Sequence, residues 1–105
     1  MTELSRILGL KLTAYVGNVK ETRAVSEWAS ASREPSAGVQ RRLRLALQVA
    51  DAIARVDGDG VARAWFQGLN PQLGDRSPAR LLREGDLDEV GPEVVGAARA
   101  FLAGG

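Results

Sequence analysis

The run of residues 36–56 constrains the fold more than any other part of this chain, because it predicts a long helix that is apolar around most of its circumference. Its polar residues recur at steps of three and four and form one narrow stripe of Arg41, Arg44, Gln48, Asp51 and Arg55. Such a helix must be covered on two sides. Pro35 and Ser36 open it, and the turn at residues 57–60 ends it. We therefore expect a central helix with the rest of the chain packed around it.

The other apolar patterns also have helical spacing, and no stretch alternates with the period of two that a strand requires. Gly68 is placed to stop a short helix, and Ser77 followed by Pro78 is typical of an N-cap and a first-turn proline. We expect further helical segments over residues 4–19, 21–32, 61–69, 77–84 and, opened by Gly91 and Pro92, 93–102. The sequence thus predicts an all-α fold, a small bundle of six to seven helices.

The composition restricts which kinds of catalytic and metal sites this chain can form, since its 105 residues include no cysteine and no histidine. Zinc fingers, disulfide frameworks, thiol nucleophiles and imidazole general bases are excluded. Asp57 and Asp59 suggest a calcium loop, but Val61, Ala62 and Gly68 stand where that motif needs ligands and a glycine. The turn at residues 57–60 is therefore interpreted as a helix stop.

A second acidic group, Asp86, Asp88 and Glu89, is expected in a solvated loop, and no set of residues supports catalysis. We therefore expect a binding protein that is not an enzyme and uses no metal and no cofactor. No apolar run is long enough for a signal peptide or a membrane span. The absence of cysteine fits a reducing compartment, and we expect a cytoplasmic protein.

The net charge of +1 conceals a division between the two halves of the chain. Residues 1–56 hold nine basic and five acidic residues, a formal charge of +4, whereas residues 57–105 hold five basic and eight acidic residues, a charge of −3. A basic half beside an acidic half suggests two faces for two partners. Chance clustering is the alternative explanation.

Part of the basic half has the pattern of a helix-turn-helix. This motif needs a small residue where two helices cross, a residue that tolerates the left-handed conformation in the turn, and an apolar anchor in the second helix. Ala14 is the small residue, Asn18 suits the turn, and Val19 and Val25 are the anchors. The turn is one residue longer than usual.

The exposed face of the second helix carries side chains that suit base edges and phosphates. The candidate DNA-contacting residues are Lys20, Thr22, Arg23, Ser26, Ser30 and Arg33. Arg41 and Arg42 are expected near the DNA backbone, whereas Glu27 on the same face opposes tight binding. The alternative is a scaffold of helix-turn-helix descent that no longer reads DNA.

The acidic half carries a set of residues in a characteristic order: Trp65, Asn70-Pro71, Leu73-Gly74, Pro78, Leu82 and Gly85, with an apolar helix closing the chain. In this order residues 58–103 resemble the toxin-binding domain of the Xre/MbcA/ParS family of antitoxins. The upstream run AYVGNVKETRAVSEWASASREP is similar to the Xre-like helix-turn-helix that precedes this domain in the same family. We expect Trp65 to be a core residue, with Leu81 and Leu82 also facing inward.

The resemblance implies an Xre-like region with the central helix over residues 1–56 and a toxin-binding domain over residues 57–105. It also implies a partner, because antitoxins of this family neutralise RES-domain toxins, which degrade NAD⁺. The family covers the toxin's active-site cleft with its C-terminal region, and many members repress their own operons. A hetero-oligomer with the toxin is therefore expected, alongside binding to operator DNA. The broad apolar surface also favours self-association, so a homodimer of the free chain is expected as well.

The expected toxin-binding residues are Arg99, Phe101, Leu102, Ala103, Gly104 and Gly105. Two alternatives stay open there: Phe101 caps the core of the protein, and Arg99 is a solvated surface residue. The chain also ends Ala-Gly-Gly, where family members often carry a bulkier apolar tail. A second function is a stand-alone helix-turn-helix transcription regulator whose acidic half only dimerises it.

Overall fold

The computed structural model describes residues 2–31 and 34–104. Within these ranges the chain forms seven α-helices and one 3₁₀ turn, and no strand. The helices are α1 (Thr2–Leu8), α2 (Leu10–Val16), α3 (Thr22–Ala29), α4 (Ala37–Asp57), α5 (Asp59–Gln67), η1 (Pro71–Leu73), α6 (Pro78–Glu84) and α7 (Leu87–Leu102). The predicted all-α bundle of six to seven helices is confirmed. None of the helices in the described ranges has both the length and the apolar character needed to cross a bilayer.

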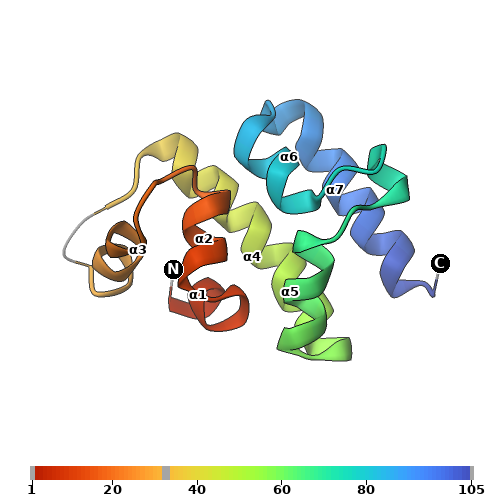
Figure 1. Ribbon diagram of the computed structural model, residues 1–105, viewed down its shortest axis with the longest axis horizontal. Coiled ribbons are helices and arrows are strands. Elements are labelled where there is room, and N and C mark those ends of the chain that lie inside the picture. Colours follow the sequence, from red (N-terminus) through yellow and green to blue (C-terminus); the bar gives the residue numbers. More distant parts are fainter. Residues whose placement is uncertain (1, 32–33, 105) are drawn as a thin grey trace.

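Helix α4 is the central element, as predicted. It runs diagonally across a flat molecule measuring 41 × 27 × 17 Å, with α1 and α2 toward one end and α6 and α7 toward the other (Figure 1). Ser36 caps it by accepting a hydrogen bond from the Val39 N–H at 3.3 Å. Its buried face consists of Leu43, Ala46, Val49, Ala50 and Ile53. Helices from both halves of the chain pack on it, namely α1, α2, α5, α6 and α7.

Two glycines with positive φ, Gly9 and Gly58, each separate two consecutive helices without a longer loop. Residues 4–19 contain two helices rather than one, because Gly9 has a φ of 85° and lies between α1 and α2. Likewise Gly58, with a φ of 96°, is the single residue between α4 and α5. The expected turn over residues 57–60 is therefore wrong in extent, since Asp57 ends one helix and Asp59 begins the next.

The last helix begins earlier than predicted. Helix α7 starts at Leu87, so Pro92 lies inside it instead of opening it. Asp86 is the N-cap and accepts a hydrogen bond from the Asp88 N–H at 3.0 Å. Asp88 and Glu89 occupy the first turn, where carboxylates stabilise the positive end of a helix. The expectation that these three residues lie in a loop is therefore wrong, because they start a helix, whereas their expected exposure to solvent is confirmed.

Arginines of the second half tie it to the first two helices. Arg63 on α5 donates from Nε to the Ile7 carbonyl at 2.7 Å, and Arg83 on α6 donates from Nη1 to the Tyr15 carbonyl at 2.8 Å. These carbonyls lie at the C-terminal ends of α1 and α2, and the Tyr15 carbonyl also accepts a hydrogen bond from the Asn18 N–H at 3.0 Å. Two side chains of the second half thus donate hydrogen bonds to the backbone of the first half.

An ion-pair cluster adds a further link between the halves. Arg6 on α1 contacts Asp59 on α5 at 3.1 Å and also pairs with Glu3. The hydrogen bond from Arg6 lowers the pKa of the Glu3 carboxyl below its ordinary value. Arg6 and Glu3 are exposed and Asp59 is half-buried, so the cluster orients α1 on α5 more than it stabilises the fold.

The close contact between α6 and α7 gives a first prediction. A Cβ added at Gly85 would lie 2.5 Å from Val90 Cγ1 and 2.8 Å from the Leu81 carbonyl oxygen, whereas one at Gly96 on α7 would meet nothing within 4 Å. We expect Gly85→Ala to lower the free energy of unfolding by about 1–3 kcal/mol through overpacking. Gly96→Ala, the matched control, should raise it by about 0.5–1 kcal/mol, because alanine favours the helix.

Urea denaturation followed by circular dichroism measures both changes. Equal stability of the Gly85→Ala variant and the native protein would contradict the close packing of α6 against α7.

Candidate functional site

Helices α2 and α3 form a helix-turn-helix arrangement whose turn has the predicted residues in the predicted roles. Asn18 has a left-handed backbone, with φ of 58°. The Val19 N–H donates to the Ala14 carbonyl at 3.0 Å and closes the turn. Ala14 and Val25 are buried between the two helices and the core. The turn is therefore set by local hydrogen bonds and by one residue that tolerates a positive φ.

The candidate DNA-contacting residues are distributed over the second helix and its two flanks. Arg23 and Ser26 are exposed on α3, and Thr22, half-buried, is its first residue. Lys20 is exposed but lies in the turn before α3, and Ser30 is the residue that follows the helix. Their expected placement on the helix itself is wrong, because α3 spans only Thr22–Ala29. Arg33 lies outside the described residues.

Arg41 and Arg42 are both engaged within the protein. Arg41 forms an ion pair with Asp88 of α7 at 2.8 Å. Arg42 is half-buried and its Nη1 lies 3.5 Å from the Gly17 carbonyl oxygen, at the turn between α2 and α3. Both arginines therefore have acceptors within the fold, and their expected place near the DNA backbone stays a prediction.

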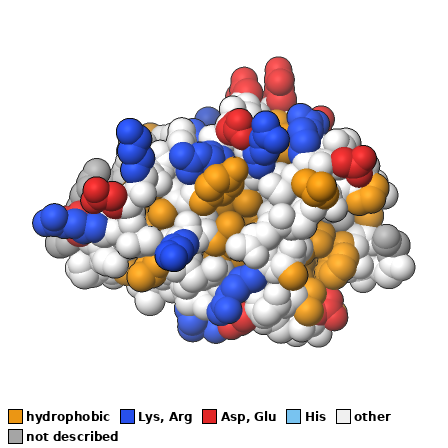
Figure 2. Space-filling model, in the orientation of Figure 1, with side chains coloured by type: hydrophobic (Ala, Val, Ile, Leu, Met, Phe, Trp, Pro, Cys, Tyr) orange, Lys and Arg blue, Asp and Glu red, His pale blue; other side chains and the backbone are white. Residues whose placement is uncertain are grey.

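A surface hollow of about 800 Å³ lies beside the start of α3. Four cationic side chains line it, Lys11, Lys20, Arg23 and Arg83, and Tyr15 forms part of its wall. We call this set the basic hollow. Figure 2 shows Lys and Arg side chains spread across the upper part of this face, from α3 toward α6. Reasoning from the sequence missed Lys11, Tyr15 and Arg83.

Arg83 lines the basic hollow because the tertiary fold places α6 beside the end of α2. Its guanidinium carbon lies 4.6 Å from the centre of the Tyr15 ring, and its Nη1 donates to the Tyr15 carbonyl. The two residues are 68 positions apart in the chain. Because no sequence pattern connects them, no local signal could have placed Arg83 beside the turn.

In the second half, the residues that carry the family resemblance have structural roles. Trp65 is buried, as predicted, with its ring edge-on to Phe66 at a centroid distance of 5.3 Å. The Asn70 side chain accepts a hydrogen bond from the Gln72 N–H at 2.9 Å and caps η1. Gly74 ends that turn with a left-handed backbone, φ 65°.

The other residues of the resemblance belong to α6 and its ends. Ser77 accepts from the Arg80 N–H at 3.1 Å and begins α6, in which Pro78 occupies the first turn. Leu81 and Leu82 are buried, as predicted, and Gly85 ends the helix. The whole set therefore specifies the packing of α5, η1 and α6.

An apolar groove of about 450 Å³ runs between the end of α5 with η1 and the end of α7. We call it the terminal groove; it is lined by Ala64, Trp65, Gly68, Leu69, Asn70, Pro71, Gln72, Ala97, Ala100 and Phe101. Phe101 packs on Trp65, with ring centroids 6.4 Å apart, yet keeps 36% of its surface exposed. Leu69 is 75% exposed. Phe101 thus covers part of the core and also presents an apolar surface outward.

The remaining candidate toxin-binding residues lie around the end of α7. Arg99, Ala103 and Gly104 are exposed, and Leu102 is half-buried against the core. Gly105 lies outside the described residues. The structure thus brings Phe101 to the terminal groove and leaves Arg99 on the surface of α7.

Comparison with known proteins finds no family model, no curated protein and no solved structure that matches this chain. The function is therefore argued from the residues of the two surfaces just described.

The left-handed turn residue gives a second prediction. Asn18→Val should lower the free energy of unfolding by about 1–2 kcal/mol, because a side chain branched at Cβ is strained at positive φ. Asn18→Gly, the matched control, should leave stability within about 0.5 kcal/mol, because glycine adopts this conformation freely. Thermal unfolding by circular dichroism gives both values. A stable Asn18→Val protein would contradict the left-handed turn.

Proposed function

We propose that this chain is the antitoxin of a type II toxin–antitoxin system, which binds a RES-domain, NAD-degrading toxin and blocks its active site. In this proposal the chain is not an enzyme; it acts in the bacterial cytoplasm by occupying its partner. The observation that carries the proposal is the terminal groove. The residues that resemble the toxin-binding domain build one packed unit, and that unit presents an open apolar groove beside the end of α7.

The distribution of exposed apolar side chains supports a protein partner at this end. Six large hydrophobic residues are exposed in the described part of the chain, and four belong to residues 56–101: Val56, Val61, Leu69 and Phe101. Figure 2 shows apolar side chains grouped on the α5–α7 end of the visible face. Contiguous exposed apolar surface is typical of a protein interaction site. Leu69 and Phe101 face the same groove and are the anchors of the proposed interface.

The last residues would extend this interface into the toxin's cleft. Arg99 is exposed on α7, and Ala103 and Gly104 follow the helix. Gly104 has a positive φ of 86°, so the chain turns there in a conformation that glycine permits. In the proposal Phe101 and Leu102 supply apolar contact, and Arg99 pairs with an acidic group of the toxin.

The first test is co-expression with the product of the neighbouring gene, with growth and cellular NAD⁺ as readouts. The neighbour alone should arrest growth and deplete NAD⁺, and this chain should restore both and co-purify with it. A harmless neighbour, or one that does not associate, would contradict the proposal.

The groove gives a third prediction. Leu69→Arg or Phe101→Arg should weaken toxin binding by about 30-fold or more, the effect of removing an interface anchor worth about 2 kcal/mol. Leu10→Arg is the matched control, because Leu10 is an exposed apolar residue at the start of α2, outside the groove. Titration calorimetry with an inactive toxin measures the affinities. Native affinity in both groove variants would exclude the groove as the interface.

A truncation tests the end of α7 directly. Removing residues 99–105 should leave the helical circular dichroism intact, since most of the buried core lies before this segment. Neutralisation of the toxin should be lost. Full protection of cells by the truncated chain would show that these residues do not block the active site.

The second candidate function is a transcription regulator that binds DNA through α2 and α3, either alone or as an antitoxin that represses its own operon. The observation that favours it is the helix-turn-helix arrangement, in which Arg23 and Ser26 are exposed on the second helix.

This candidate gives a fourth prediction. The double variant Arg23→Ala and Ser26→Ala should bind the duplex upstream of the gene no better than a scrambled duplex, because the base contacts are lost while phosphate contacts remain. Fluorescence anisotropy with both duplexes measures the preference. An unchanged preference would exclude α3 as the recognition helix.

A further inference from the structure

We infer that the DNA-binding surface extends beyond the helix-turn-helix, and that the basic hollow binds a phosphate of the DNA backbone with Arg83, from the second half of the chain, as one of its ligands. This inference rests on the DNA-binding part of the proposed function.

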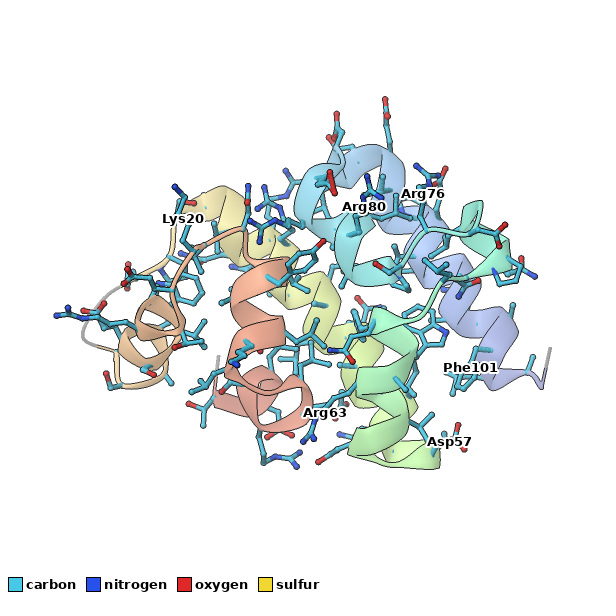
Figure 3. All side chains as sticks on the ribbon, in the orientation of Figure 1. Lys20, Asp57, Arg63, Arg76, Arg80 and Phe101 are labelled. Atoms are coloured by element: carbon cyan, nitrogen blue, oxygen red, sulfur yellow. The ribbon has the colours of Figure 1, made fainter. Side chains whose placement is uncertain are left out.

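The charge of the hollow suits a phosphate. Lys11, Lys20, Arg23 and Arg83 converge on it from α2, the turn, α3 and α6, and Glu21 is the one acidic residue that lines it. Protein contacts with DNA phosphates come mainly from lysine, arginine and hydroxyl side chains. In Figure 3, Lys20 lies at one end of this upper side of the molecule and Arg80 and Arg76 continue it over α6 and η1.

Arg83 is held in a fixed orientation before any ligand binds. One nitrogen, Nη1, donates to the Tyr15 carbonyl at 2.8 Å, and the guanidinium stacks over the Tyr15 ring at 4.6 Å. Its Nε and Nη2 donate to no other described residue, so both can donate hydrogen bonds to a phosphate oxygen. A stacked guanidinium that is already ordered loses little conformational freedom when it binds an oxyanion. Tyr15, 38% exposed, lines the same hollow.

The position of the hollow matches the path of a DNA strand. In a helix-turn-helix complex the N-terminal residues of the second helix reach the base edges, while the first helix crosses the backbone. Here Lys11 lies in the first turn of α2 and Arg83 lies against its C-terminal end, so the two cations flank the helix that would cross the backbone. The Glu21 side chain does not cap α3, whose positive end therefore faces the hollow uncapped.

The test measures binding of a fluorescein-labelled duplex from the region upstream of the gene, and of a scrambled duplex, between about 50 and about 200 mM salt. Arg83→Gln and Lys11→Gln should each reduce the slope of log affinity against log salt by about 0.9, the value for one lost phosphate contact. Both duplexes should be affected alike, because phosphates carry no sequence information.

Arg55→Gln is the matched control, since it removes the same charge from the polar stripe of α4, where Arg55 pairs with Asp51 at 2.8 Å. Its salt slope should equal that of the native protein. Lys11→Gln keeps the test valid if Arg83→Gln perturbs the end of α2, because Lys11 donates to no described residue. Arg23→Gln reports on the recognition helix separately.

Native slopes in both Arg83→Gln and Lys11→Gln, with a reduced slope in Arg23→Gln, would overturn the inference and leave DNA binding by the helix-turn-helix intact. Failure of the native protein to bind either duplex would overturn the inference together with DNA binding. Toxin neutralisation, measured through cellular NAD⁺, is independent of both results.

Discussion

The need to cover α4 organises the rest of this structure. Five apolar residues of α4 are buried, Leu43, Ala46, Val49, Ala50 and Ile53, and burial of apolar surface is the dominant favourable term in folding. Five of the other helices pack on it. Helices as short as α1 and α2, with seven residues each, do not persist alone in water. They form here because α4 provides an apolar surface on which their own apolar faces are buried.

Hydrogen bonds from two arginines then fix the orientation of the two halves of the chain around α4. The ends of α1 and α2 each receive a donor from the second half, Arg63 and Arg83 respectively. Each of these contacts joins a side chain of the second half to the backbone of the first, so they orient the first two helices relative to α5 and α6. The helix-turn-helix arrangement is therefore positioned partly by residues that belong to the proposed toxin-binding domain.

The two candidate surfaces lie at opposite ends of the long axis of the molecule. Figure 3 places Lys20, in the basic hollow, near one end and Phe101, in the terminal groove, near the other. One surface is lined by four cations, and the other is mainly apolar. This separation is compatible with an antitoxin that holds a toxin at one end while the other end contacts operator DNA. The basic and acidic halves of the sequence do not correspond fully to separate basic and acidic surfaces, because Arg83 adds a cation from the acidic half to the basic hollow.

The sequence by itself determined the elements whose signals are local. The polar stripe of α4, the N-caps Ser36 and Ser77 and the left-handed Asn18 all depend on neighbours within a few residues, and each is found as predicted. The burial of Trp65 was predictable for a similar reason, since a large aromatic at helical spacing favours the core.

The tertiary structure decided the features that depend on distant contacts. Gly91 lets α7 approach α4, since an added Cβ at this position would lie 3.0 Å from Leu45 Cδ1. The early start of α7, which places Pro92 inside the helix, depends instead on the local cap by Asp86. Arg83 reaches the basic hollow because α6 packs against α2. Local patterns specify backbone conformation through short-range hydrogen bonds and sterics. Which side chains share a surface depends on how the helices pack, and that is fixed only when the whole core is assembled.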